Sequence, residues 1–277
     1  MFIVILIVFG LAFGSFINAL VWRVHEQSRP KKKRVASDSE LSIYRGRSMC
    51  PHCQHTLAWY DLLPVVSWAL LRGKCRYCHK PISAQYPIVE LTTAGLFTSS
   101  YVFWPFALVG AVSYLLFGLW LVCLVMLVAL AVYDLRWMLL PNRIVFPLTA
   151  VSVVYAGLSA VVADDPKQSI LLSVVSLLIA GGIFYVLFQI SASKWIGGGD
   201  VKIGFALGLL LGLPQFAFLM LFLASIIGIV FSLPTIIFKK VGLKGQIPFG
   251  PALIVATVVV KLFGASIITW YTGMFLL

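Results

Sequence analysis

Residues 108–132 read LVGAVSYLLFGLWLVCLVMLVALAV, a run without a single Asp, Glu, Lys or Arg. A helix of this length can cross roughly 30 Å of bilayer hydrocarbon at about 1.5 Å per residue. The sequence therefore predicts a membrane-spanning helix here.

The rest of the chain has the same character. Its 277 residues are 61% hydrophobic and only 11% charged, outside the usual range of a soluble domain. We predict an all-α polytopic membrane protein with about eight transmembrane helices, the sixth being the shortest. They are expected at residues 2–22, 87–104, 108–132, 143–162, 168–190, 201–213, 215–238 and 251–274.

The chain is expected to have three parts: a first transmembrane helix (1–22), a polar module (23–86) and a transmembrane core (87–277). The first helix lacks a basic segment before it and a cleavage site of small residues after it. It is therefore interpreted as a retained signal anchor.

The basic residues predict the orientation of these helices. Of the 21 Lys and Arg residues, all but Lys167 and Lys261 fall in loops that an eight-span arrangement puts on one side. Because positive charge is retained in the cytoplasm, that side is predicted to be cytoplasmic, with both termini outside. The run PKKKR at residues 30–34 would suggest nucleic-acid binding in a soluble protein. Beside a membrane helix, we interpret it as an orientation signal that contacts anionic lipid, and we expect no nucleic-acid partner.

Four of the five cysteines form two C-x-x-C pairs in the polar module: Cys50, Cys53, Cys75 and Cys78. Two such pairs, 21 residues apart, are typical of a zinc ribbon, in which each pair supplies two thiolate ligands. Two disulfides or a redox pair are the alternatives, and a reducing cytoplasm disfavours them. His52, His55 and His79 could each replace a thiolate, or be unliganded surface residues. Four thiolates leave no open position for water, so the zinc is expected to be structural.

Acidic residues are scarce, and three of them lie at the edge of predicted hydrocarbon: Glu90, Asp134 and Asp200. A carboxylate in such a place is a functional candidate. Asp134 and Asp200 fall at the same predicted cytoplasmic boundary. Two carboxylates that meet share a proton, and such a pair can activate water and protonate a leaving amine. The pair is thus a candidate for peptide hydrolysis without a metal.

Gly197, Gly198 and Gly199 directly precede Asp200. Glycines let a backbone approach closely, so an extended substrate could lie against this turn. The alternative is a flexible turn at the membrane edge, with each aspartate acting as a helix cap or pairing with Arg136 or Lys202.

At this point the sequence resembles the bacterial type IV prepilin peptidases, aspartyl proteases of the GxGD class. The resemblance covers nearly the whole chain and keeps the order of the family's motifs. They are GSFIN (14–18), CPHC (50–53), WYD (59–61), LRGKC (71–75), YPIVEL (86–91), LPN (140–142) after Asp134, GGGDVK (197–202) and IPFGPA (247–252).

The resemblance implies a multi-pass enzyme of the bacterial inner membrane that cleaves the basic leader of prepilins and pseudopilins after a glycine. Asp134 and Asp200 would be catalytic at the cytoplasmic face. The four cysteines imply the form that also methylates the new N-terminus with S-adenosylmethionine, although no Gly-rich fingerprint of a methyl-donor site occurs in the loop. Glu90 is expected to support the site, or else to pair with a nearby Arg or a helix N-terminus. Lys202 is expected to position Asp200 or to bind lipid phosphate.

Two other classes of protein remain as alternatives. In a transporter or channel, the two aspartates would relay ions and the glycines would mark a broken helix. In a membrane-anchored zinc-ribbon scaffold without activity, the two aspartate motifs would have no explanation.

Overall fold

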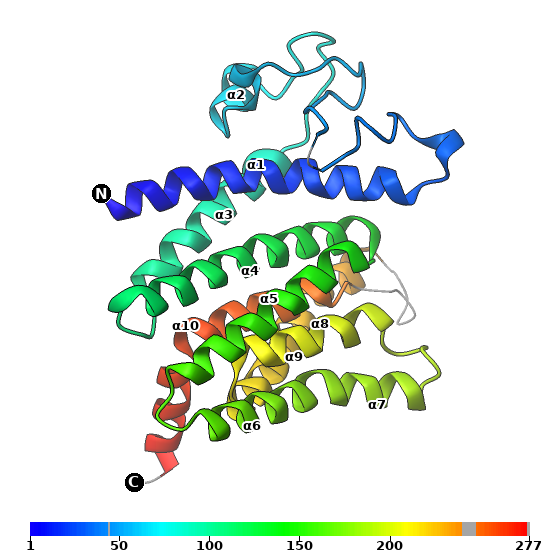
Figure 1. Ribbon diagram of the computed structural model, residues 1–277. Coiled ribbons are helices and arrows are strands. Elements are labelled where there is room, and N and C mark those ends of the chain that lie inside the picture. The colour runs from blue at the N-terminus through cyan, green and yellow to red at the C-terminus, as the bar shows by residue number, and fades with distance from the viewer. Residues whose placement is uncertain (44, 240–247, 276–277) are drawn as a thin grey trace. The chain divides into compact units, whose positions relative to one another are not determined.

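The computed structural model describes residues 1–43, 45–239 and 248–275, and within these ranges it is helical and has no β-strand. Lys240, Lys244 and Ile247, which belong to the last basic loop and the last motif, lie outside them. The chain forms two compact units, Met1–Val102 and Phe103–Leu277 (Figure 1).

The predicted all-α fold is confirmed, and each expected span overlaps a helix. The long helices are α1 (Phe2–Ser28), α3 (Gln85–Val102), α4 (Gly110–Trp137), α5 (Asn142–Val161), α6 (Pro166–Leu177), α7 (Ile183–Ile190), α8 (Gly198–Leu211), α9 (Pro214–Lys239) and α10 (Gly250–Phe275). A π-helical turn, η3 (Leu178–Gly182), joins α6 to α7 and makes one continuous rod of Pro166–Ile190.

Six helices in the described ranges are long and apolar enough to cross a membrane: α1, α4, α5, the α6–α7 rod, Pro214–Phe231 of α9 and Gly250–Met274 of α10. Helices α3 and α8 occupy the positions of the other two expected spans but do not meet this standard. Helix α8 has 14 residues and is about 21 Å long, shorter than roughly 30 Å of hydrocarbon. The chain is thus a multi-pass membrane protein, and the eight-span count stays a prediction.

In the first unit, α1 and α3 cross at two glycines of α1. A Cβ atom on Gly10 would lie 2.5 Å from the Cα atom of Ala94, and one on Gly14 would lie 2.5 Å from the Cα atom of Glu90. These distances leave no room for a side chain, so the two backbones are in direct contact. Glycines four residues apart favour such close packing of membrane helices, where van der Waals contact drives association.

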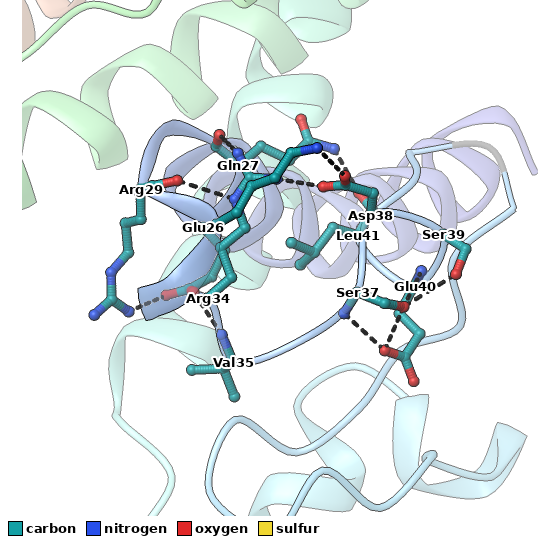
Figure 2. Close-up of polar contacts among 11 residues, drawn as sticks. Glu26, Gln27, Arg29, Arg34, Val35, Ser37, Asp38, Ser39, Glu40 and Leu41 are labelled. Atoms are coloured by element: carbon teal, nitrogen blue, oxygen red, sulfur yellow. Dashed lines mark hydrogen bonds and ion pairs between the residues drawn. The ribbon is translucent and has the colours of Figure 1, made fainter.

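The polar stretch after α1 folds back on the end of that helix (Figure 2). Arg34 donates to the Gln27 carbonyl oxygen at 2.7 Å and also pairs with Asp38. The buried Glu26 accepts a hydrogen bond from the backbone N–H of Val35. The end of α1 is thereby covered by the chain that follows it.

A second arginine completes this cover. Arg23 is buried, and its guanidinium donates to the carbonyl oxygens of Ser42 and Gly46. The side chain of Leu41 is fully buried nearby. These contacts explain why α1 runs to Ser28, six residues past the end of the apolar run.

In the second unit, α8 is the central helix and contacts α5, α6, η3, α7, α9 and α10. Close packing again depends on glycine. A Cβ atom on Gly208 would lie 2.6 Å from the Cα atom of Leu177, and one on Gly204 would lie 2.8 Å from the Ala180 carbonyl oxygen. The face of α8 that carries these glycines therefore lies directly against α6 and η3.

The C-terminal end of α8 is buried, so its last carbonyl groups need donors from other helices. Ser176 donates to the Gly208 carbonyl oxygen at 2.7 Å, and Lys261 of α10 donates to that of Leu210 at 2.9 Å. Lys261 is itself buried, with its ammonium 4.4 Å from the centre of the Tyr155 ring. A cation at a helix C-terminus is favourable because it complements the helix dipole.

We therefore expect Lys261→Met to destabilise the protein by about 1–3 kcal/mol, because the Leu210 carbonyl would be left buried without its donor. Thermal unfolding in detergent micelles measures this, with Val255→Met, at an exposed position of the same helix, as the matched control. Equal unfolding temperatures for wild type and Lys261→Met would show that the lysine does not stabilise α8.

Candidate active site and metal site

Asp134 lies in the last turn of α4 and is buried. Its Oδ2 atom accepts a hydrogen bond of 3.1 Å from the backbone N–H of Gly250, the first residue of α10. A Cβ atom on Gly250 would lie 2.7 Å from the same oxygen. The carboxyl group is therefore held by a backbone donor at a position where only glycine fits without displacement.

Asp200 lies in the first turn of α8, three residues after the N-cap Gly197. The N-terminal end of a helix favours negative charge. The carboxyl group of Asp200 is close enough to that of Asp134 for the two to interact electrostatically. The structure thus brings the two predicted catalytic carboxylates together, although the two residues are 66 positions apart in the sequence.

The segments that carry the aspartates also contact each other. A Cβ atom on Gly199 would lie 2.9 Å from the Cβ atom of Leu140, and the ammonium of Lys202 donates to the Asn142 side-chain oxygen at 2.9 Å. Leu140 and Asn142 belong to the motif that follows Asp134. Gly199 and Lys202 therefore join the two aspartate motifs.

The alternative role for the aspartates, as partners of nearby basic residues, receives no support in the described part of the chain. Lys202 donates to Asn142, and the guanidinium of Arg136 lies over the Trp137 ring. None of the ion pairs found among the described residues includes Asp134 or Asp200.

Gly250 was not expected as a site residue, although the motif that contains it was recognised. Its role depends on a backbone N–H that meets a carboxylate 116 residues away in the sequence, which no local pattern reveals. The sequence signal that could have indicated this role is the glycine itself, because the first residue of a helix ordinarily tolerates a side chain.

We expect Gly250→Ala to lower the activity that depends on Asp134 by about a hundredfold, since a shift of roughly 1 Å in a reacting group has an effect of this size. Gly273→Ala, also in α10 but with no atom within 4 Å of the added Cβ, is the matched control. Turnover of both variants, compared at equal amounts of folded protein, measures the effect. Full activity of Gly250→Ala would mean that the Asp134 carboxyl group tolerates displacement.

The four cysteines of the first unit form a compact group: their sulfur atoms all lie within 4.8 Å of one another. Four ligands at about 2.3 Å from a tetrahedral zinc ion lie about 3.8 Å apart, so the group fits a single ion after a small contraction. The group of possible ligands found there contains no histidine. His55 instead stacks on the Tyr77 ring, with 3.7 Å between ring centres.

The two C-x-x-C pairs have the same backbone fold. In the first, the N–H of Cys50 donates to the His55 carbonyl oxygen and the N–H of Gln54 to that of Cys50. In the second, the N–H of Cys75 donates to the Lys80 carbonyl oxygen and the N–H of His79 to that of Cys75. Adding 25 to each residue number of the first turn gives its counterpart in the second, and both turns contain a residue with positive φ, Gln54 and His79. The module is a repeat of two matching knuckles.

At Cys75, backbone amides favour the thiolate form that a metal requires. Although burial opposes ionisation, the N–H groups of Cys78 and Tyr77 help to lower the pKa of Cys75 to about 7. Asp61 lies in the 3₁₀ turn Trp59–Leu62, before α2 (Val66–Leu70), and links this turn to the second knuckle by accepting from Arg76 at 2.8 Å and from Tyr77 at 3.0 Å. Burial alone would raise the pKa of Asp61, but these hydrogen bonds hold it below its ordinary value.

Glu90 lies in α3 of the first unit and is buried. It accepts a hydrogen bond of 2.7 Å from the backbone N–H of Val65 and is in hydrogen-bonding contact with Ser15. These contacts are all within its own unit. Glu90 thus joins α1, α3 and the residue before α2 (Val66–Leu70).

Comparison with known proteins divides the chain at the same place as the structure. A model described as the bacterial peptidase A24 N-terminal domain matches residues 8–104, and that of the type IV leader peptidase family matches residues 120–233. Several similar relatives carry the name prepilin leader peptidase/N-methyltransferase. That of Aeromonas hydrophila is 31% identical (97% of this chain, 93% of the relative), that of Vibrio cholerae 32% (94% and 96%) and that of Bacillus subtilis 30% (98% and 98%). No solved structure matches the chain.

Proposed function

Because the chain belongs to the type IV leader peptidase family, we propose that it is an aspartyl endopeptidase that removes the leader from type IV prepilins and pseudopilins. The observation that carries this proposal is the pair of interacting carboxyl groups, that of Asp134 in the last turn of α4 and that of Asp200 in the first turn of α8. Relatives over nearly the full length of the chain carry the corresponding name.

In this reaction the two aspartates share one proton, because like charges at close range disfavour double ionisation. The ionised carboxylate takes a proton from water as the water attacks the scissile carbonyl. The protonated carboxyl group donates to that carbonyl oxygen. As the tetrahedral intermediate collapses, the carboxyl group that took the proton from water gives it to the leaving amine. The Gly250 N–H keeps the Oδ2 atom of Asp134 in place throughout.

The three glycines before Asp200 are proposed to support an extended substrate. Gly199 already packs closely on Leu140, whereas a Cβ atom on Gly198 would meet only Phe188, at 3.6 Å. The backbone around Gly197 and Gly198 can therefore accept a neighbouring strand without side-chain interference. Lys202 is proposed to support the site through its bond to Asn142, which ties the two motifs together.

The first unit is proposed to serve a second reaction, methylation of the new N-terminal amine by S-adenosylmethionine, as the relatives' names include an N-methyltransferase. We propose zinc as the metal, held by Cys50, Cys53, Cys75 and Cys78. A closed shell of four thiolates supplies structure and no open coordination position. Glu90 supports this unit by holding the residue that precedes α2.

We propose that the enzyme lies in the bacterial inner membrane with its catalytic pair at the cytoplasmic face and both termini outside. The distribution of Lys and Arg supports this orientation. Lys31, Lys32 and Lys33 are exposed beyond the end of α1 and are proposed to contact anionic lipid. The leader of a prepilin would reach the active site from the same side.

The test is incubation of a prepilin with membranes that contain the chain, and with membranes that lack it, followed by mass spectrometry. We expect a product shortened after a glycine, and a further 14 Da when S-adenosylmethionine is added, the mass of one methylene unit. An unchanged prepilin would reject the peptidase and favour an ion transporter, in which two carboxylates at helix ends also have a use.

A further inference from the structure

Residues 62–71 read LLPVVSWALL, a run of the polar module that contains no Asp, Glu, Lys, Arg or His. Several of its large apolar side chains point away from the protein. Leu62, Leu63, Val66 and Leu70 are all exposed, Leu70 to 78%. A contiguous exposed apolar patch marks a surface that contacts something other than water.

The hydrogen bond to Glu90 fixes the depth of this run along α1. The backbone of Glu90 is level with Gly14, where the two helices touch. Gly14 precedes Trp22, near the end of the apolar part of α1, by eight residues, or about 12 Å of helix. Because Glu90 binds the N–H of Val65 at 2.7 Å, residues 62–71 begin at a level where α1 is surrounded by hydrocarbon.

Two donors of the run are satisfied from within the unit, as a lipid environment requires. Val65 has a positive φ and precedes the first turn of α2, where a backbone N–H has no helical partner; the Glu90 carboxylate accepts it. The indole N–H of Trp68 donates to the Ile82 carbonyl oxygen at 3.1 Å. The exposed large side chains are thus apolar, while these two donors bind acceptors of the same unit.

Charges begin directly after the run. Arg72 and Lys74 are exposed, and long basic side chains at the edge of a bilayer extend to the lipid phosphates. An apolar run of 10–14 residues is too short to span a membrane and is typical of buried core helices or of interfacial and re-entrant segments. The exposure of Leu62, Leu63, Val66 and Leu70 excludes a buried core helix here.

We infer that residues 62–71 insert into the leaflet at the C-terminal end of α1, where their exposed side chains contact lipid acyl chains. Glu90 anchors the segment, and Arg72 and Lys74 bind the phosphate groups of the lipid. The metal-binding module is therefore held at the membrane surface by a second attachment besides α1 and α3. This inference depends on α1 crossing the bilayer and is independent of the proposed reaction.

The test uses the unaltered full-length chain in nanodiscs of phosphatidylethanolamine and phosphatidylglycerol. A fraction of the lipid carries a photoreactive diazirine at the end of one acyl chain, and labelled residues are located by mass spectrometry after illumination. We expect labelling of residues 62–71 at least tenfold above that of residues 51–57 in the first knuckle. Phe13, exposed on α1, is the positive control.

A labelled Phe13 with residues 62–71 unlabelled would overturn the inference and would mean that this surface binds protein, either a second copy or another part of the chain. The anchor is tested with Glu90→Ala under the same conditions. We expect labelling of residues 62–71 to fall severalfold while the metal content and the labelling of Phe13 stay unchanged. Undiminished labelling would show that Glu90 does not hold the segment in the bilayer.

Discussion

Asp134→Asn and Asp200→Asn are each expected to lower the rate of prepilin cleavage by about a thousandfold or more. Asparagine keeps the shape of the side chain but can neither accept the proton from water nor return one to the leaving amine, and groups that act as a unit lose most of their effect when either is removed. The double variant should therefore be scarcely slower than either single one. Initial rates with one purified prepilin, measured at equal amounts of folded protein, provide the comparison.

Asp164→Asn is the matched control, because Asp164 is exposed in the turn between α5 and α6. It should cleave at the wild-type rate. Cleavage by both active-site variants at more than about a tenth of the wild-type rate would refute the dyad, since acid–base catalysis of this kind contributes about 10²–10⁴-fold.

Cys75→Ser is expected to abolish metal binding, from about one ion per chain to almost none. Structural zinc binds with about 10–16 kcal/mol of apparent free energy, and this supports folding of the segment that carries the ligands. Loss of the ion should therefore expose residues 48–80 to protease while the helices of the second unit stay intact. Elemental analysis and limited proteolysis in nanodiscs measure the two effects.

Cys123 supplies the control for that experiment. It is the fifth cysteine, buried in α4 of the second unit and remote in sequence from the other four. Cys123→Ala should keep the metal and the protease resistance of the module. Retention of the ion by Cys75→Ser would contradict a site built from four sulfurs.

The sequence predicted the helices well because hydropathy alone decides where a membrane helix can be. It predicted their ends less well. The apolar run ends at residue 132, yet α4 continues to Trp137 and carries Asp134 inside its last turn. Helix α1 likewise continues to Ser28, because Arg23 and Glu26 find partners in the chain that folds back on them. Such continuation depends on tertiary contacts, which hydropathy does not contain.

The residue types of the candidate site could be predicted from the sequence, but their geometry could not. The scarcity of acidic residues singled out Asp134 and Asp200, and the spacing of the cysteines singled out the four sulfurs that the structure brings together as candidate metal ligands. Two hydrogen bonds were not predictable: the one that the Gly250 N–H donates to Asp134 and the one that the Val65 N–H donates to Glu90. In both, the backbone N–H is far in the sequence from the carboxylate that accepts it. In the sequence, Lys261 is only an exception to the charge distribution, whereas in the structure its ammonium donates to the Leu210 carbonyl oxygen at the buried end of α8.

Both knuckles precede α3 in the sequence, and this determines the order in which the first unit can form during synthesis. Cys78 completes the ligand set, whereas the crossing of α1 with α3 requires residues as far as Ala94. At roughly 5–20 residues per second, a ribosome needs about one to three seconds for that interval. If the four cysteines bind zinc as proposed, the nascent chain can take up the ion before α3 has been completed. A substitution that blocks the α1–α3 crossing would then leave a metal-bound module attached to an unpaired α1, and cellular quality control would degrade such a chain. Removal of the metal by a chelator would not produce this state.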